Sequence, residues 1–174
     1  MTVQKSSAAN SAALLERVRQ LLDRQATGEA LEALNTSGLN TRAVQNAKGV
    51  CLMRIGRVEG AAKILCELVL PKGAFTIPDD VPAELRANYA ATWFLQGDYV
   101  AGAAILGQAP DRRHPAVKRL KAALQAWKKT LPWWRRVLLP LGVNPKTSLP
   151  AGPEIGELWL PEAAQTVGPD RGAA

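Results

Sequence analysis

The stretch from Val44 to Leu68 decides the fold, and it reads VQNAKGVCLMRIGRVEGAAKILCEL. The same pattern returns 41 residues later, from Leu85 to Ala109, as LRANYAATWFLQGDYVAGAAILGQA. Small residues match small ones and large apolar residues match large apolar ones: Gly49 with Ala90, Leu52 with Trp93, Gly56 with Gly97, Ala61 with Gly102, and Leu65 with Leu106. Such self-similarity at a fixed spacing indicates a repeat architecture.

Each copy of the pattern predicts a pair of short antiparallel helices. Gly56 and Gly97 stand where the chain must reverse, and glycine adopts a positive φ without a Cβ penalty. Small residues at the matched positions let the two helices of a pair approach closely, while the large apolar ones fill the seam between them. The helices expected from this periodicity cover roughly 42–55, 57–70, 83–96 and 98–108.

At these positions the chain resembles the tetratricopeptide repeat family. The family pattern is a small first-helix residue, a large apolar residue three further on, a turn glycine, and then Ala-x3-aromatic or Leu. The resemblance covers 41–110, with Gln45 and Arg86 in place of the early tryptophan. The spacing of 41 exceeds the family's ~34, so residues 71–82 would be an insertion, and HEAT-type repeats remain the alternative fold.

The flanking sequence extends this prediction to an all-α solenoid of about three helix pairs over residues 11–142. A helical stripe from Leu14 to Leu22, followed by a second short helix, indicates a degenerate first repeat. Trp127 follows Trp93 by 34 residues and marks a further first helix. Pro132 then starts a short helix, which we expect to be a buried C-terminal cap, as a solenoid needs.

The composition at both ends of the chain predicts disorder. Residues 1–10 are small and polar, which is typical of a disordered N-terminus. Residues 143–174 form an acidic tail rich in proline and glycine, with Leu158-Trp159-Leu160 as its one apolar island. This composition predicts an extended and largely disordered segment.

Composition and motifs argue against several classes of function. The net charge of +7 favours acidic partners without naming one. The sequence shows no zinc-ligand spacing, no nucleotide-binding glycine motif and no catalytic constellation, and His114 is the only histidine. We therefore expect no enzyme activity, metal, cofactor or small-molecule substrate. Cys51 and Cys66 are expected to be free thiols, and the absence of a signal-peptide or membrane-span pattern predicts a cytoplasmic protein.

A basic patch suggests what the domain binds. Arg112 to Arg136 holds nine basic residues and no acidic one. The family resemblance implies a concave groove lined by first-helix side chains, here Asn46, Val50, Met53, Arg54, Ala87, Ala91, Phe94, Lys121, Gln125 and Lys128. The main hypothesis is a non-enzymatic protein–protein interaction module, or scaffold, that binds an extended acidic peptide or protein segment. The chain's own tail would also fit this groove, so self-occlusion stays open.

Two other partners compete for the basic patch. Segment 127–141 mixes cationic residues with tryptophan and leucine, as interfacial helices do, so a peripheral membrane protein is the alternative. The residues that would contact a membrane or anion are Trp133, Trp134, Arg135 and Arg136. Nucleic acid is the least favoured partner, because the sequence contains no known DNA- or RNA-binding motif.

Overall fold

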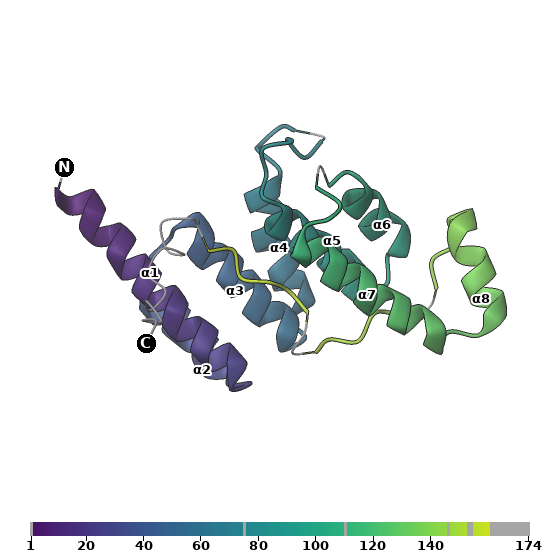
Figure 1. Ribbon diagram of the computed structural model, residues 1–174, viewed down its shortest axis with the longest axis horizontal. Helices are drawn as coiled ribbons and strands as arrows, with labels where there is room; N and C mark the ends of the chain where they lie inside the picture. Colours follow the sequence, from purple (N-terminus) through teal and green to yellow (C-terminus); the bar gives the residue numbers. More distant parts are fainter. Residues whose placement is uncertain (1, 75, 110, 146, 153–154, 161–174) are drawn as a thin grey trace, which may run out of the picture.

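The computed structural model describes residues 2–74, 76–109, 111–145, 147–152 and 155–160 (Figure 1). In this part of the chain the structure is all-α, with eight helices, one 3-10 turn and no strand. The helices are α1 Thr2–Asp23, α2 Thr27–Thr36, α3 Arg42–Arg54, α4 Val58–Val69, α5 Ala83–Leu95, α6 Tyr99–Gly107, α7 Pro115–Thr130 and α8 Trp133–Leu138, and the 3-10 turn η1 is Leu139–Leu141.

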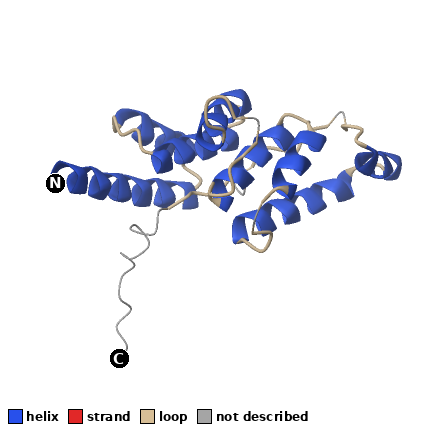
Figure 2. Ribbon diagram, turned by 90° about the horizontal axis from the view of Figure 1, so that it is seen from above, coloured by secondary structure: helices blue, strands red, loops and turns tan. Residues whose placement is uncertain are grey.

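Successive helices pack in antiparallel pairs, α1 with α2, α3 with α4, and α5 with α6. The pairs are joined because α2 also contacts α3, and α4 also contacts α5. The odd-numbered helices contact one another in order, α1 with α3, α3 with α5, and α5 with α7. The elements therefore follow one another along the long axis of the molecule, from α1 at one end to α8 at the other (Figures 1 and 2).

The turns within the two central pairs are where the sequence predicted them. Gly56 and Gly97 have φ angles of 79° and 86°, a region that favours glycine. Thr41 caps α3 by accepting a hydrogen bond from the Val44 N–H, and Asp98 caps α6 by accepting one from the Ala101 N–H. The helix-pair prediction for 42–108 is therefore confirmed at the level of elements and turns.

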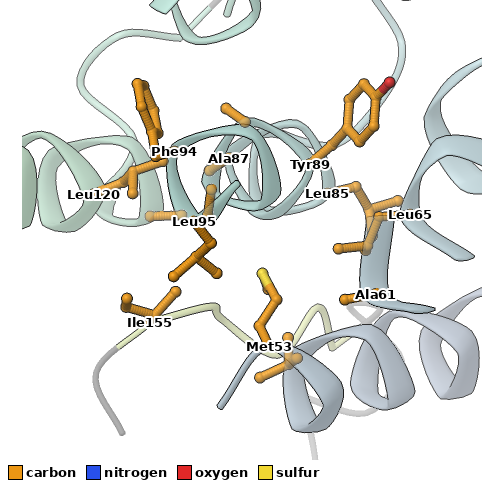
Figure 3. Packing of buried hydrophobic residues seen from close by; sticks show 14 of the residues in the cluster. Met53, Ala61, Leu65, Leu85, Ala87, Tyr89, Phe94, Leu95, Leu120 and Ile155 are labelled. Atoms are coloured by element: carbon orange, nitrogen blue, oxygen red, sulfur yellow. The ribbon is translucent and has the colours of Figure 1, made fainter. Parts of the chain in front are cut away.

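Close helix approach at the matched small residues is also confirmed. A Cβ added at Gly49 would lie 2.9 Å from Leu65 Cγ, and one added at Gly102 would lie 2.8 Å from Phe94 Cε1. These glycines thus bring α3 onto α4 and α5 onto α6. The seams between the helices are filled by fully or nearly fully buried apolar side chains, several of which are seen in Figure 3.

The insertion between the two pairs is tied to the core by a buried arginine. Arg86 is 1% exposed, and its guanidinium donates to the carbonyl oxygens of Pro78 at 2.7 Å and Gln108 at 3.1 Å. Burial lowers the pKa of Arg86, against the opposing effect of Asp79 and Asp80. The residue that replaces the expected tryptophan therefore fastens the insertion and the end of α6 to α5.

Three predictions about the ends of the domain differ from the structure. Residues 2–10 belong to α1 instead of a disordered N-terminus. No residue of α8 is buried, and within the predicted cap (residues 132–142) the buried side chain is Leu139 of η1, so most of this segment is not the buried cap that was predicted. Pro132 and Pro140 limit this helix to six residues, and most of its large apolar side chains face solvent. The third prediction was an extended and largely disordered tail. Its residues 147–152 and 155–160 lie along the helical domain, and the prediction for 161–174 falls outside the described residues.

Candidate functional site

The odd-numbered helices border an open cleft of about 830 Å³. Each of α1, α3, α5 and α7 contributes side chains to its walls, and residues 155–158 and Leu160 form a further wall. Figure 1 shows this C-terminal segment, in yellow, crossing α3. One wall of the cleft is therefore the protein's own chain, here called the cis segment (residues 155–160).

Asn88 on α5 holds the cis segment by its backbone. Its Nδ2 donates to the Glu157 carbonyl oxygen at 2.7 Å, and its Oδ1 accepts from the Glu157 N–H at 2.8 Å. Asn46 on α3 donates to the same carbonyl at 3.1 Å and accepts from Asn88 Nδ2 at 2.8 Å. Both asparagines are almost completely buried. Because buried amides need partners, the two side chains require a peptide unit at this position.

Arg54, at the end of α3, binds the two preceding carbonyl groups. Its Nε donates to the Ile155 oxygen and its Nη2 to the Gly156 oxygen, each at 3.1 Å. Burial lowers the pKa of Arg54, but an arginine starts so far above neutral pH that the guanidinium stays charged. Three consecutive peptide units of the cis segment are thus recognised through their main chain.

The floor of the cleft is shaped for a glycine. Gly156 has a φ of 82°, and a Cβ added there would lie 2.8 Å from Met53 Cε and 3.2 Å from Val50. Ile155 is buried beside this point, and Figure 3 shows it near Met53 and Leu95. Any side chain at position 156 would meet both a strained backbone and an occupied space.

Side-chain contacts extend the interaction in both directions. Arg119 on α7 forms an ion pair with the Glu157 carboxylate. The Arg42 guanidinium, at the start of α3, lies 5.9 Å from the centre of the Trp159 ring. Upstream, the Leu149 N–H donates to the Phe94 carbonyl at 3.0 Å. The chain therefore runs past α5 and then antiparallel to α3.

The structure brings together only part of the groove predicted from sequence. Asn46, Val50, Met53 and Arg54 all lie against the cis segment. Ala87 and Ala91 line the cleft. The remaining predicted residues line a separate hollow of about 260 Å³ beside α6: Phe94, Lys121, Gln125 and Lys128.

The residues predicted for the basic end of the groove do not line this cleft, because α7 presents a different face to it. Its side toward the cleft carries alanines, among them Ala123 and Ala126, together with Arg119. The Lys128 ammonium instead lies 4.7 Å from the centre of the Tyr99 ring, outside the cleft. The positive charge in the cleft therefore comes from Arg54 and Arg119, and from Arg19 on α1.

Asn88 and Arg119 are among the residues of this site that sequence reasoning missed. The repeat spacing of 41 paired Asn46 with Ala87, whereas the structure pairs it with Asn88, one residue later. A second asparagine within an otherwise apolar helical stretch was the available signal, because a buried amide must find a partner. Arg119 carried no signal beyond its membership of the basic run.

The groups with possible covalent or metal chemistry lie apart from the cleft's contacts. Burial raises the pKa of Cys51 to about 11, so its thiol stays protonated and unreactive near neutral pH. His114 caps α7 by accepting from the Ala116 N–H. Among the described residues no three His, Cys, Asp or Glu side chains are grouped to hold a metal ion. The chemistry that the cleft displays is hydrogen bonding to an extended main chain.

The other predicted contact segment lies at the far end of the molecule. Trp133 and Trp134 on α8 are 75% and 47% exposed. Arg135 packs over the Trp134 ring, while Arg136 donates to the Leu131 and Lys129 carbonyls at the end of α7. None of the described helices has the length and apolar character needed to span a membrane.

No protein-family model, curated protein or solved structure matches this chain.

Proposed function

We propose that this protein is a non-enzymatic interaction module that binds an extended peptide segment in the cleft between α3, α5 and α7. The observation that carries the proposal is the pairing of both backbone groups of Glu157 with the Asn88 side chain. Main-chain recognition of this kind accepts any extended segment, and neighbouring pockets then select its side chains. The cis segment is the first example of such a ligand.

The helix arrangement supports a degenerate tetratricopeptide-like architecture. Antiparallel pairs follow one another, and the first helices of the pairs contact each other and border the cleft. The close approaches at Gly49 and Gly102 are those that the repeat pattern requires. In this proposal the cleft is the groove that first helices form in such repeats.

The cis segment also indicates which ligands fit. Position 156 requires glycine, because of its positive φ and the contact with Met53. The next position favours a carboxylate, which pairs with Arg119. The second position after the carboxylate, occupied by Trp159, lies near Arg42. The proposed ligand is therefore an extended segment of a protein with the order glycine, acidic residue, then large apolar residues.

Occupation of the cleft by the cis segment sets the affinity that a competing ligand needs. A covalently attached segment competes at an effective concentration of about millimolar when the linker is short. A partner at lower concentration must therefore bind more tightly than the cis segment, or act together with a second contact. Peptides that bind weakly and without specificity are thereby excluded from the cleft.

The test is binding of a fluorescent peptide with the sequence of residues 150–160, measured by anisotropy. The full chain carrying Gly156→Val should release its cis segment and bind the peptide at least about tenfold more tightly than the wild type. Gly152→Val is the matched control, because a Cβ at Gly152 meets nothing within 4 Å. It should bind the peptide as weakly as the wild type.

Two results would count against the proposal. If folded Gly156→Val protein fails to bind the peptide, the cleft does not recognise peptides in trans. If Gly156→Val binds but a further Asn88→Ala change leaves that binding intact, the peptide sits elsewhere. Far-ultraviolet circular dichroism of each variant separates loss of binding from loss of folding.

A further inference from the structure

The large apolar side chains at the α8 end form one exposed face. Trp133, Trp134, Val137 and Leu141 are 75%, 47%, 60% and 72% exposed. At about 100° per residue Trp133, Trp134 and Val137 fall within an arc of about 100°, so they share one side of α8, and Leu141 follows in the 3-10 turn η1. Val143, also exposed, follows them. Exposed apolar side chains gathered in this way mark interaction sites in soluble proteins.

Basic side chains accompany this face without an acidic neighbour in the sequence. From Arg112 to Pro153 the chain contains no Asp or Glu. Arg135 lies over the Trp134 ring, with its guanidinium carbon 4.9 Å from the ring centre. Lys129, at the end of α7, is exposed. Arg136 has a different role, because its hydrogen bonds to the Leu131 and Lys129 carbonyls fix α8 against the end of α7.

We infer that the α8 face (Trp133, Trp134, Val137 and Leu141, with Lys129 and Arg135) docks onto an anionic lipid surface. Tryptophan has an apolar body and a polar N–H, and it favours the boundary between headgroups and acyl chains. Lysine and arginine beside it attract anionic headgroups. Charge complementarity therefore selects a negatively charged membrane as the occupant.

A second copy of the chain fits this face less well. A two-fold symmetric interface brings the same patch of both copies together, so the Arg135 and Lys129 side chains of both copies would gather at one interface. Those like charges would repel one another, and the 112–153 segment supplies no carboxylate to compensate them. A lipid surface avoids this repulsion because its charge has the opposite sign.

The location of α8 allows docking without rearrangement of the domain. It lies at the end of the molecule opposite the N-terminus of α1, beyond the packed helices (Figures 1 and 2). An interfacial helix needs to enter only about 5–10 Å into the headgroup region. The cleft residues Asn46, Asn88 and Arg54 lie on other helices, so docking of α8 would not change what covers them.

The experiment is vesicle co-sedimentation of the full chain. The vesicles are phosphatidylcholine alone or with about one-third phosphatidylserine, at about 0.1 M and about 0.5 M salt. The wild type should bind the anionic vesicles at the lower salt and lose most of that binding at the higher salt. Trp133→Ser/Trp134→Ser should lower the bound-to-free ratio at least about tenfold, since two interfacial anchors are removed.

Matched variants separate a specific contact from general basicity. Lys129→Gln/Arg135→Gln should weaken binding several-fold more than Arg112→Gln/Arg113→Gln. The two pairs remove equal charge, and Arg112 and Arg113 precede the opposite end of α7. Equal losses from the two pairs would overturn the assignment of the α8 face, leaving only diffuse electrostatic attraction.

Two other results would also overturn the inference. One is unchanged vesicle binding by Trp133→Ser/Trp134→Ser. The other is absence of wild-type binding to anionic vesicles at the lower salt. If sedimentation velocity then shows a wild-type dimer that the tryptophan variant loses, the occupant of the face is a second copy. Peptide binding in the cleft is measured separately, so neither result depends on the proposed function.

Discussion

Two surfaces of this molecule combine apolar side chains with arginines, and only one of them is covered. The cleft side of α3 and α5 holds residues 155–160, so Asn46, Asn88 and Met53 are buried. The α8 face, beyond the C-terminal end of α7, leaves Trp133 and Leu141 in solvent. The covered surface has buried polar groups that pair with a peptide backbone, whereas the exposed face presents indole and basic side chains at the surface.

The two surfaces differ in where their polar groups find hydrogen-bond partners. Without the cis segment the amides of Asn46 and Asn88 would lose their hydrogen bonds to the Glu157 backbone, so these bonds favour covering that surface. The indole and arginine side chains of α8 can remain hydrated at modest cost, because their polar ends reach water. The comparison predicts that substitutions at the covered surface change stability, while those at the exposed face leave it unchanged.

Met53→Ala should have the largest effect on stability. This side chain is fully buried between α3 and the cis segment, so its loss leaves a cavity and removes the contact with Gly156. We expect the free energy of unfolding in urea to fall by about 2–5 kcal/mol. Val137→Ala on the α8 face is the comparison, with a change within about 0.5 kcal/mol. Equal effects would contradict the contrast between the surfaces.

Asn88→Ala should have the next largest effect. It removes the two hydrogen bonds to Glu157 and leaves Asn46 without one partner. A loss of about 1–3 kcal/mol in unfolding free energy follows from such unsatisfied buried groups. The exposed Asn144 also makes two hydrogen bonds, to Val100 and Asp98, and Asn144→Ala should cost less. An Asn88→Ala protein as stable as the wild type would show that the clamp contributes nothing.

The helix pairs could be predicted from sequence because their determinants are local. A turn glycine, such as Gly56 or Gly97, and small residues such as Gly49 fix the turn and the approach of two helices that are adjacent in the chain. Those features were read correctly. The face that α7 turns to the cleft was not predicted. Aligning α7 with α5 through Trp93 and Trp127 assumed that both helices present the same face, although the repeat spacing changes between them. In the structure Trp127 stacks on Tyr99, and α7 turns its alanines to the cleft.

The sequence left occupation of the groove by the tail open, but the ordered contacts of the cis segment could not be predicted, because they depend on partners far away in the sequence. Proline and glycine content alone indicates disorder in residues 147–160. The segment is held by hydrogen bonds from Asn88, Asn46 and Arg54. These residues precede their partners in the segment by 69 to 111 positions. Local composition contains no information about such a complementary surface.

Arg119→Gln should have a small effect on the covered surface. The ion pair with Glu157 is partly exposed, with the Arg119 side chain 67% accessible. Such pairs contribute about 0.2–1 kcal/mol and are screened by salt. The difference in unfolding free energy between wild type and variant should therefore shrink toward zero in high salt. A difference that persists in high salt would show that Arg119 acts by packing instead of charge.

Trp133→Ser/Trp134→Ser should have the smallest effect on stability. Neither side chain is buried, so the urea midpoint should stay within an equivalent of about 0.5 kcal/mol of wild type. A loss of more than about 2 kcal/mol would mean that α8 is part of the core. The same variant is the one expected to lose vesicle binding, which makes stability and binding independent readouts of this face.

The most direct test of the central claim is amide hydrogen exchange at Glu157. Isotope-labelled full-length protein would be measured by NMR, alone and with excess unlabelled peptide of residues 150–160. We predict slow exchange in the free protein, because Asn88 accepts from this N–H, and exchange at least about tenfold faster with peptide, as the cis segment is displaced. Protection that survives saturating peptide, or that is absent from the free protein, would contradict a displaceable ligand in the cleft.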